Sequence, residues 1–382
     1  MYRSSAIAGL GMALFLLIAP GLAGAQERGP DASITGISKA FNPALSVNGL
    51  FYGLFSSLEH PKLLGDDLET GLKVQEFELA FDANVDPYLK ATVIMSLPGG
   101  NGIELEEGYV TTLGLPHSLQ ARGGKMYEAF GLHNRLHTHA FPFLDPPLVN
   151  RAIFGPEGLN DTGVELSWLA PLPWFSEVRG AVYDGQNEFV FAGKKQEDLS
   201  YLARFENLWD LGPSATLRLG GSYVRGPHLL PGSTAMPATP AKEVASEVWG
   251  GDAQIKWRPV NWQRKAAVVW QAEYLNYREF QGRHASEPLD GYYTHLLVQV
   301  SRRWWVQGRY DEDWEHKGYW ALTGPAPTTL EDHAWSGAVA FVPTEFQAYK
   351  LGYEARDYAG ETEYRYWLQV NVTVGSHPAH AY

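Results

Sequence analysis

Residues Glu361–Gly375 read ETEYRYWLQVNVTVG, and the alternation in this stretch decides the fold. One set of alternate positions is apolar: Tyr364, Tyr366, Leu368, Val370, Val372 and Val374. The other set is mostly polar: Arg365, Trp367, Gln369, Asn371 and Thr373. An amphipathic helix would need apolar residues three and four positions apart, whereas a β-strand sends successive side chains to opposite faces. The stretch therefore predicts a strand with one apolar and one polar face.

The same two-residue period recurs along the chain, for example in residues 73–85, 198–207 and 214–226. Counting such runs gives about sixteen strands, with centres near residues 50, 79, 92, 108, 121, 165, 180, 202, 219, 252, 270, 296, 307, 338, 350 and 368. The phase over 103–114 is ambiguous, because Glu104, Glu106 and Glu107 occupy both faces.

Alternation of apolar and polar residues also occurs in a large soluble β-sandwich or β-helix. The lengths of the connections between the strands distinguish these folds from a membrane barrel. Connections here alternate between short ones and long ones. The short connections include Asp86-Pro87, Leu115-Pro116, Pro171–Pro173, Ser301-Arg302 and Pro343-Thr344, and the long ones lie near 57–72, 128–160, 185–197, 226–245, 279–289 and 312–331. Short periplasmic turns, long extracellular loops and aromatic residues at strand ends are typical of outer-membrane barrels. We therefore predict an all-β, transmembrane, antiparallel β-barrel of about 16 strands, wide enough for an aqueous lumen.

The N-terminus predicts export. Arg3 precedes an apolar run over 6–20, and Ala23-Gly24-Ala25 fits a signal-peptidase site. The run is shorter than the roughly 20 residues that a membrane anchor needs. We therefore expect a signal peptide over 1–25, a periplasmic N-terminal segment over 26–43 and an outer-membrane barrel over 44–382, in a Gram-negative bacterium.

Composition narrows the function. The 382 residues include no cysteine, which excludes disulfides and cysteine-based zinc sites. The net charge of −13 argues against a nucleic-acid partner, because phosphate binding needs a basic face. The chain is rich in aromatic residues and glycine, with 13 Trp, 20 Tyr, 17 Phe and 40 Gly. These features agree with a barrel in contact with outer-membrane lipid.

The lumen-facing positions carry charges of both signs. We assign to the lumen Glu76, Glu78, Asp82, Arg122, Glu165, Arg179, Arg204, Arg218, Arg309, Lys350 and Arg365. Facing rows of opposite charge can screen solutes by sign, or the charges can simply pair with one another in a wet interior. Acidic residues on the first long loop, such as Glu69, suggest a mild cation preference at the outer mouth.

Residues Gly131–Pro147, GLHNRLHTHAFPFLDPP, hold three histidines within seven positions. We assign to a pore constriction His133, Arg135, His137, His139, Asp145 and Arg151. One interpretation is a polar loop packed on the lumen wall. Another is a transient zinc site on His133, His137 and His139, although their spacing matches no strict signature. A catalytic role has little support because no G-x-S-x-G elbow is present, so we expect no enzyme activity.

The stretch Gly123–Pro171 carries several short motifs. They are Gly124-Lys125, Phe130-Gly131, Asp145-Pro146-Pro147-Leu148, Phe154-Gly155 and Gly163-Val164-Glu165-Leu166. With them the stretch resembles the porin-like barrels related to the phosphate-selective porin group, and within that group the barrels labelled zinc-regulated outer-membrane receptor. The resemblance implies that the long loop after the fifth strand, residues 128–158, folds into the lumen and constricts it. Phosphate selectivity would require mainly basic residues along the lumen. The lumen residues assigned here carry charges of both signs, so phosphate selectivity is not carried over from the resemblance.

The resulting functional prediction is an outer-membrane channel for passive diffusion of small hydrophilic solutes or ions. A first alternative is a zinc- or metal-linked uptake protein, receptor-like but without a plug. Residues 26–43 are too few for a plug, and a 22-stranded transporter would exceed the 382 − 25 = 357 residues of the mature chain. A second alternative is an outer-membrane barrel hydrolase. The sequence leaves the oligomeric state open, with a homotrimer as one possibility. No cofactor other than transient zinc is expected.

Overall fold

The computed structural model describes residues 43–58, 68–99, 102–187, 189–191, 198–230, 242–262, 266–280, 288–315, 330–358 and 361–375. The predicted signal peptide over 1–25 lies outside these residues, as does the segment 26–43 except for its last residue. No helix in the described part of the chain is long and apolar enough to cross a membrane.

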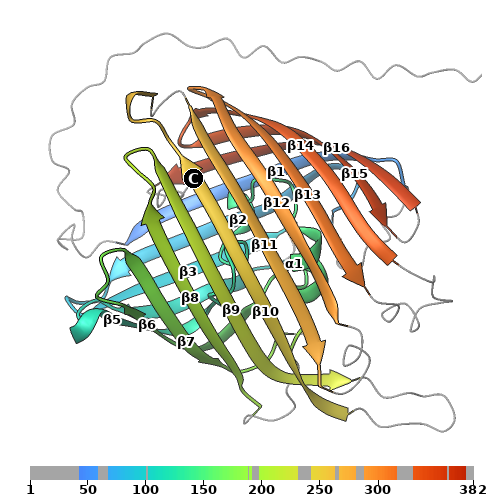
Figure 1. Cartoon of the computed structure of the whole chain (residues 1–382). Coiled ribbons are helices and arrows are strands. Elements are labelled where there is room, and N and C mark those ends of the chain that lie inside the picture. Colours follow the sequence, from blue (N-terminus) through green and yellow to red (C-terminus); the bar gives the residue numbers. More distant parts are fainter. Residues whose placement is uncertain are drawn as a thin grey trace, which may run out of the picture. The chain divides into compact units, whose positions relative to one another are not determined.

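Sixteen antiparallel strands form a closed barrel. Figure 1 shows how they are arranged around it. The strands are β1 (Ala44–Ser56), β2 (Gly71–Asn84), β3 (Leu89–Pro98), β4 (Glu104–Thr112), β5 (Leu119–Tyr127), β6 (Asn160–Leu169), β7 (Phe175–Tyr183), β8 (Ser200–Asp210), β9 (Ala215–Leu230), β10 (Lys242–Trp257), β11 (Ala267–Glu279), β12 (Leu289–Ser301), β13 (Trp304–Glu315), β14 (Leu330–Thr344), β15 (Gln347–Tyr358) and β16 (Glu361–Gly375). Each strand pairs with its neighbours in sequence, and β1 closes the barrel against β16. The predicted fold class is confirmed, and each predicted centre falls inside its own strand.

The alternation of the sequence appears as an alternation of exposure. On β16, Tyr366 is 54% exposed on the outer face, whereas its neighbour Arg365 is 2% exposed inside the barrel. Large apolar side chains cover the outer face of the other strands too, including Leu351 and Trp335. An outward apolar band with a polar interior is the arrangement that a bilayer requires of a barrel. The protein is therefore an outer-membrane β-barrel.

A β-bulge explains the ambiguous phase of β4. Ile94 of β3 pairs with Glu107, but the next residue, Met95, pairs with Leu105. Glu106 is thus the extra residue of the bulge, and an extra residue lets two consecutive side chains turn to the same side. Both Glu106 and Glu107 are buried.

Two predicted connections need correction. Pro343 and Thr344 are the last residues of β14 and not a turn, because the ladder to β15 continues to the Thr344–Gln347 pair. The predicted long loop over 226–245 is shorter than expected, since β9 and β10 stay paired out to Leu230 and Lys242. Proline at the very end of a strand is tolerated where no ladder hydrogen bond is lost, which is why Pro343 gave a misleading turn signal.

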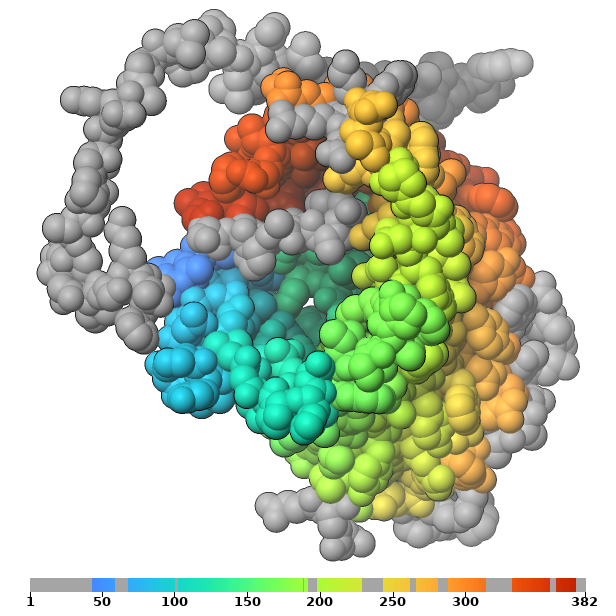
Figure 2. All heavy atoms as spheres, turned by 60° about the vertical axis from the view of Figure 1, so that its left-hand side comes forward, coloured from blue at the N-terminus to red at the C-terminus, as the bar shows by residue number. Residues whose placement is uncertain are grey.

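The connection between β5 and β6, residues 128–159, folds into the barrel and is called the inserted segment below. It contains the one-turn 3-10 helix η3 (Thr138–Ala140) and the helix α1 (Leu148–Phe154). Two further 3-10 turns, η2 (Pro116–Ser118) and η4 (Val260–Trp262), lie in short connections. In Figure 2 the atoms of the inserted segment, in teal and green, lie in the hollow of the barrel. The predicted inward-folding loop after the fifth strand is confirmed.

Candidate functional site: the lumen and its inserted segment

The inserted segment leaves and rejoins the wall at neighbouring points, because Tyr127 at the end of β5 pairs with Asn160 at the start of β6. The side chain of Asn134 ties the two ends together. Its amide donates to the carbonyls of Glu128 (3.0 Å) and Leu159 (2.9 Å), and its Oδ1 accepts from the Leu159 amide (2.6 Å). Asn134 is buried, so these hydrogen bonds satisfy backbone groups that water does not reach.

A tight turn follows at Gly131, where φ is +58°. The Gly131 amide donates to Ser222 Oγ of β9 (3.1 Å), and the next two amides, of Leu132 and His133, donate to Glu273 Oε1 of β11 (2.5 and 2.7 Å). A Cβ at Gly131 would lie 2.6 Å from Glu273 Oε2. Glycine is therefore required here both by the backbone conformation and by the close approach of Glu273.

Apolar residues fasten the segment to one side of the lumen. Phe130, Val149, Ile153, Phe154 and Leu159 of the segment belong to a buried cluster. The wall contributes inward-facing apolar residues from β7 to β12: Ala181, Tyr183, Leu202, Val224, Val248, Leu275, Tyr277, Leu289 and Tyr293. These residues lie among polar residues of the lumen face, and burying them against the segment removes their apolar surface from water.

Asp145 lies at the centre of four arginines, of which Arg309, Arg356 and Arg365 are on the barrel wall and Arg151 is on α1 of the segment. Its carboxylate is 3.1 Å from Arg151, 3.1 Å from Arg309, 2.9 Å from Arg356 and 3.6 Å from Arg365. Burial alone would raise the pKa of Asp145, but the four guanidinium groups hold that pKa well below its usual range. The aspartate is thus ionised and joins the segment to β13, β15 and β16.

Three further carboxylates complete the arginine cluster. Asp311 is 2.6 Å from Arg309, Glu354 is 2.7 Å from Arg356, and Glu363 is 2.9 Å from Arg365. With Asp145 the cluster holds four acidic and four basic groups. Charges buried in this way remain stable only when they are paired and hydrogen-bonded.

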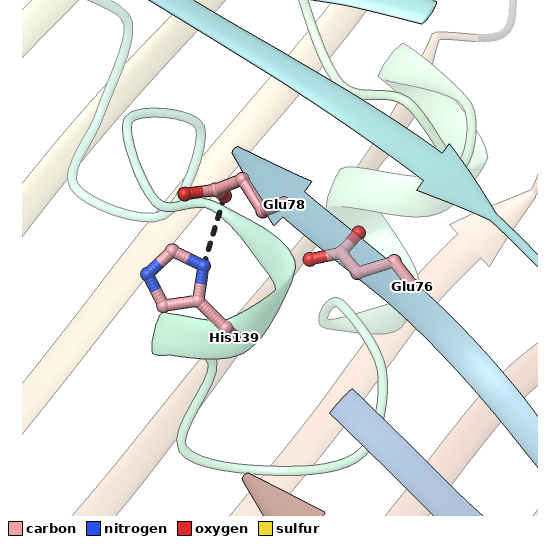
Figure 3. Close-up of side chains that lie close together, drawn as sticks. All are labelled: Glu76, Glu78 and His139. Carbon is pink, nitrogen blue, oxygen red and sulfur yellow. Dashed lines mark ion pairs between the residues drawn. The ribbon is translucent and has the colours of Figure 1, made fainter. Parts of the chain in front are cut away.

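A second charged cluster joins the segment to β2 and β4. His139 Nδ1 lies 2.9 Å from Glu78 Oε2, an ion pair marked by the dashed line in Figure 3. His137 lies 2.9 Å from Glu106, 3.1 Å from Glu107 and 3.4 Å from Glu78. Burial alone would lower the pKa of His137, but its hydrogen bonds to Glu106 and Glu107 and the charge of Glu78 raise that pKa well above its ordinary value.

His133 lies apart from the other two histidines. Its ring packs 4.6 Å from that of Phe141 and 6.1 Å from that of Tyr293. Burial, together with the positive charge of Arg309, lowers the pKa of His133 to about 3. The structure therefore brings His137 and His139 together but does not gather all three predicted metal ligands around one point.

The remaining predicted lumen residues lie on strands and mostly pair with neighbours. Glu165 is 2.8 Å from Arg122 and 2.9 Å from Arg179. Arg204 lies 2.6 Å from Asp252 and 2.9 Å from Glu206, and Glu206 also pairs with Arg218 (3.6 Å) and with Arg135 of the segment (3.3 Å). Asp82 pairs with Lys90 (2.9 Å), and Lys350 donates to the carbonyl oxygen of Phe141.

A cavity of about 490 Å³ lies between the inserted segment and the lumen face of β9 to β15. It is at the end of the barrel that has the short turns, since it reaches Arg258 and Arg302 just beyond β10 and β12. Its charged lining residues are Arg135, Arg218, Lys256, Arg258, Arg302 and Lys350, and no Asp or Glu lines it within the described residues. This cavity is called the basic vestibule below.

Sequence reasoning missed several of the residues that build this site. Glu106 and Glu107 were set aside because the bulge confused the phase of β4. Leu202, Val224 and Val248 carried a usable signal, because each is an apolar residue two positions after a buried, lumen-facing serine. Asn134 binds backbone groups at both ends of the segment, and no sequence pattern predicts such contacts.

Comparison with known proteins gives a relative by sequence and neighbours by structure. No protein-family model matches the chain. An uncharacterized protein of Aquifex aeolicus (strain VF5) is 28% identical over 380 residues, covering 88% of this chain and 75% of that protein.

Solved outer-membrane barrels superpose on most of the chain. OprB of Pseudomonas putida matches with a TM-score of 0.59 at 9% identity, over 88% of this chain and 94% of that one. An anion-selective porin of Comamonas acidovorans matches with a TM-score of 0.54 at 11% identity, over 87% of this chain and 100% of that one. The outer membrane channel DcaP of Acinetobacter baumannii matches with a TM-score of 0.53 at 12% identity, over 88% of this chain and 99% of that one. At these identities the likeness establishes the fold, which is a sixteen-stranded barrel of the outer-membrane porin type.

Proposed function

We propose that this barrel is a passive channel for small hydrophilic solutes, narrowed by the inserted segment, and that anions cross the narrow zone more readily than cations. The basic vestibule carries this proposal. A solute that passes the segment on the β9–β15 side meets arginine and lysine side chains but no carboxylate among the described lining residues. In a low-dielectric channel, charges of one sign concentrate the opposite ion.

Pairing inside the barrel supports the proposed preference. Most lumen carboxylates are engaged elsewhere, as Glu165 is by Arg122 and Arg179. Lys350 donates to a neutral carbonyl oxygen, so that interaction does not cancel its charge. This proposal replaces the cation preference expected from the first long loop, whose residues 59–67 lie outside the described part of the chain.

Planar-bilayer recording across a KCl gradient tests the proposal. We expect stepwise, ohmic conductance and a reversal potential that shows Cl⁻ to be more permeant than K⁺. The triple variant Lys256→Gln/Arg258→Gln/Arg302→Gln should lose most of that preference. Arg303→Gln is the matched control, because Arg303 is exposed on the same turn and does not line the vestibule. A wild-type reversal potential that favours K⁺, or a triple variant equal to the control, would contradict the proposal.

The hydrolase alternative gains no support from the side chains it would need. Ser336 donates to Glu354 (2.8 Å), while His333, the histidine nearest to it in sequence, pairs with Asp357 (2.9 Å). A nucleophilic serine needs a histidine base within hydrogen-bond reach. Ser336 and His333 are each directed to a carboxylate instead.

A metal-linked uptake role is the second candidate, and the cluster of His137 and His139 with the glutamates of β2 and β4 favours it. The homotrimer stays a prediction, and so does a role for outer-membrane lipid beyond contact with the apolar outer face.

A further inference from the structure

Four glutamates and two histidines converge where the inserted segment meets β2 and β4. Glu76 and Glu78 are two residues apart on β2 and therefore share the lumen face. The bulge in β4 turns Glu106 and Glu107 inward beside them. All four glutamates are at most 8% exposed. With all four carboxylates ionised and both imidazoles protonated, this buried group would carry two more negative than positive charges.

Glu78, Glu106 and Glu107 form ion pairs with His137 and His139. Burying carboxylates is costly unless positive charge compensates them. A divalent cation would supply compensating charge that two imidazolium groups cannot.

Glu76 supplies an independent observation. Its side chain is 5% exposed, and its Oε1 is buried without a hydrogen-bond partner. Figure 3 shows the Glu76 carboxylate directed toward Glu78 and His139. Buried polar atoms are seldom left without a partner, and an ion is one of the recognised explanations when they are.

The distances fit a metal site. One ligand atom from each of Glu76, Glu78 and His139 lies within 4.8 Å of the others, and the same holds for Glu78, Glu106 and His137. With Zn–N and Zn–O bonds of about 2.0–2.1 Å, tetrahedral ligand atoms are roughly 3.3 Å apart. Small side-chain movements would bring either set to that spacing, and Glu78 belongs to both.

We propose that a divalent cation of the Zn²⁺ class binds between His137 and His139 of the inserted segment and the glutamates of β2 and β4, and that it pins the segment to this wall. Mixed imidazole and carboxylate ligands suit Zn²⁺ and neighbouring transition metals, whereas Mg²⁺ prefers oxygen ligands in octahedral geometry. His133 has no part in the site, because it packs against Phe141 and Tyr293.

Zn²⁺ binding to the folded, heat-modifiable protein in detergent tests this directly, by competition with a chromophoric chelator. The assay does not depend on whether the barrel conducts, so its failure is distinct from failure of the channel proposal. We expect one Zn²⁺ per chain for the wild type and no competition by Mg²⁺. Glu78→Gln and the double variant His137→Ala/His139→Ala should each bind at least tenfold more weakly.

Two histidine variants outside the site serve as controls. His133→Ala lies in the same segment, and His333→Ala removes a partly exposed histidine of β14. Both should bind within about threefold of the wild type. Glu78→Gln keeps the shape of the side chain and removes one buried charge, so it guards against a loss of binding caused by misfolding.

A second readout addresses the pinning. Saturating Zn²⁺ should slow tryptic cleavage after Arg135 in the wild type and leave the rate unchanged in Glu78→Gln. Absence of Zn²⁺ binding to the wild type, wild-type affinity in Glu78→Gln, or an equal loss of affinity in His133→Ala would overturn the site. Cleavage at the same rate with and without Zn²⁺ in the wild type would overturn the pinning.

Discussion

Asp145→Asn should release the inserted segment from the β13–β16 wall. Asp145 is 4% exposed and shares its carboxylate among Arg151, Arg309, Arg356 and Arg365. The substitution leaves four buried arginines facing three carboxylates, and so one uncompensated positive charge. Removing one partner from a buried ion pair costs about 3–5 kcal/mol. At about 1.4 kcal/mol per factor of ten, the released population should rise roughly 10²- to 10³-fold or more.

Limited trypsin digestion of the folded barrel measures this release, because Arg135 and Arg151 are cleavage sites within the segment. Heat modifiability on a gel confirms that the barrel itself stays folded. Asp82→Asn is the matched control: Asp82 pairs with Lys90 on a wetter part of the lumen wall, where the side chains are 25% and 40% exposed. Such pairs contribute about 0–1 kcal/mol, so cleavage should hardly change. An Asp145→Asn segment as resistant as the wild type would refute the reasoning.

Three further changes test other attachments of the segment. Gly131→Ala places a Cβ 2.6 Å from Glu273 Oε2 at a φ of +58°, so segment docking should weaken by about 1–3 kcal/mol and trypsin cleavage after Arg135 should quicken; unchanged cleavage would argue against the tight turn. Asn134→Ala leaves buried backbone groups at both ends of the segment without partners and should cost about 2–4 kcal/mol by the same protease assay, whereas a cost below about 0.5 kcal/mol would mean that water replaces the side chain. The pKa of His133 is about 3 when docked and about 6.5 when released, so the released form binds more protons and docking should weaken by about 1.6 kcal/mol between pH 6.5 and pH 5. His133→Gln should remove that part of the pH dependence, and an identical pH profile in wild type and variant would contradict it.

The strand pattern was predictable because one physical cause controls it. Lipid contacts one face of every strand, so residues such as Tyr366 and Leu368 had to be apolar at alternate positions. The same rule failed at β4, where the bulge at Glu106 shifts the alternation by one residue. The rule also predicts polar residues at the inward positions of Leu202 and Val224. These residues are apolar, and the inserted segment covers them.

The candidate site was only partly predictable, because its chemistry depends on partners far apart in sequence. Asp145, Arg309 and Arg365 were each assigned to the lumen or its constriction, but nothing in the spacing showed that they meet in one cluster. The three histidines looked equivalent in sequence, yet His137 and His139 face glutamates and His133 faces aromatic rings. Which lumen charges stay open to a solute also depends on pairing, and the basic vestibule appears only once those pairs are known.

Single-channel conductance is the most direct test of a channel narrowed by the inserted segment. Because Tyr127 and Asn160 pair at the barrel wall, residues 128–159 can be replaced by a short Gly-rich turn without stretching β5 or β6. We expect the wild type to conduct in small ohmic steps and the shortened variant to conduct in clearly larger ones. Folded wild-type protein that stays silent in the bilayer, or equal step sizes for the two proteins, would contradict the proposed channel.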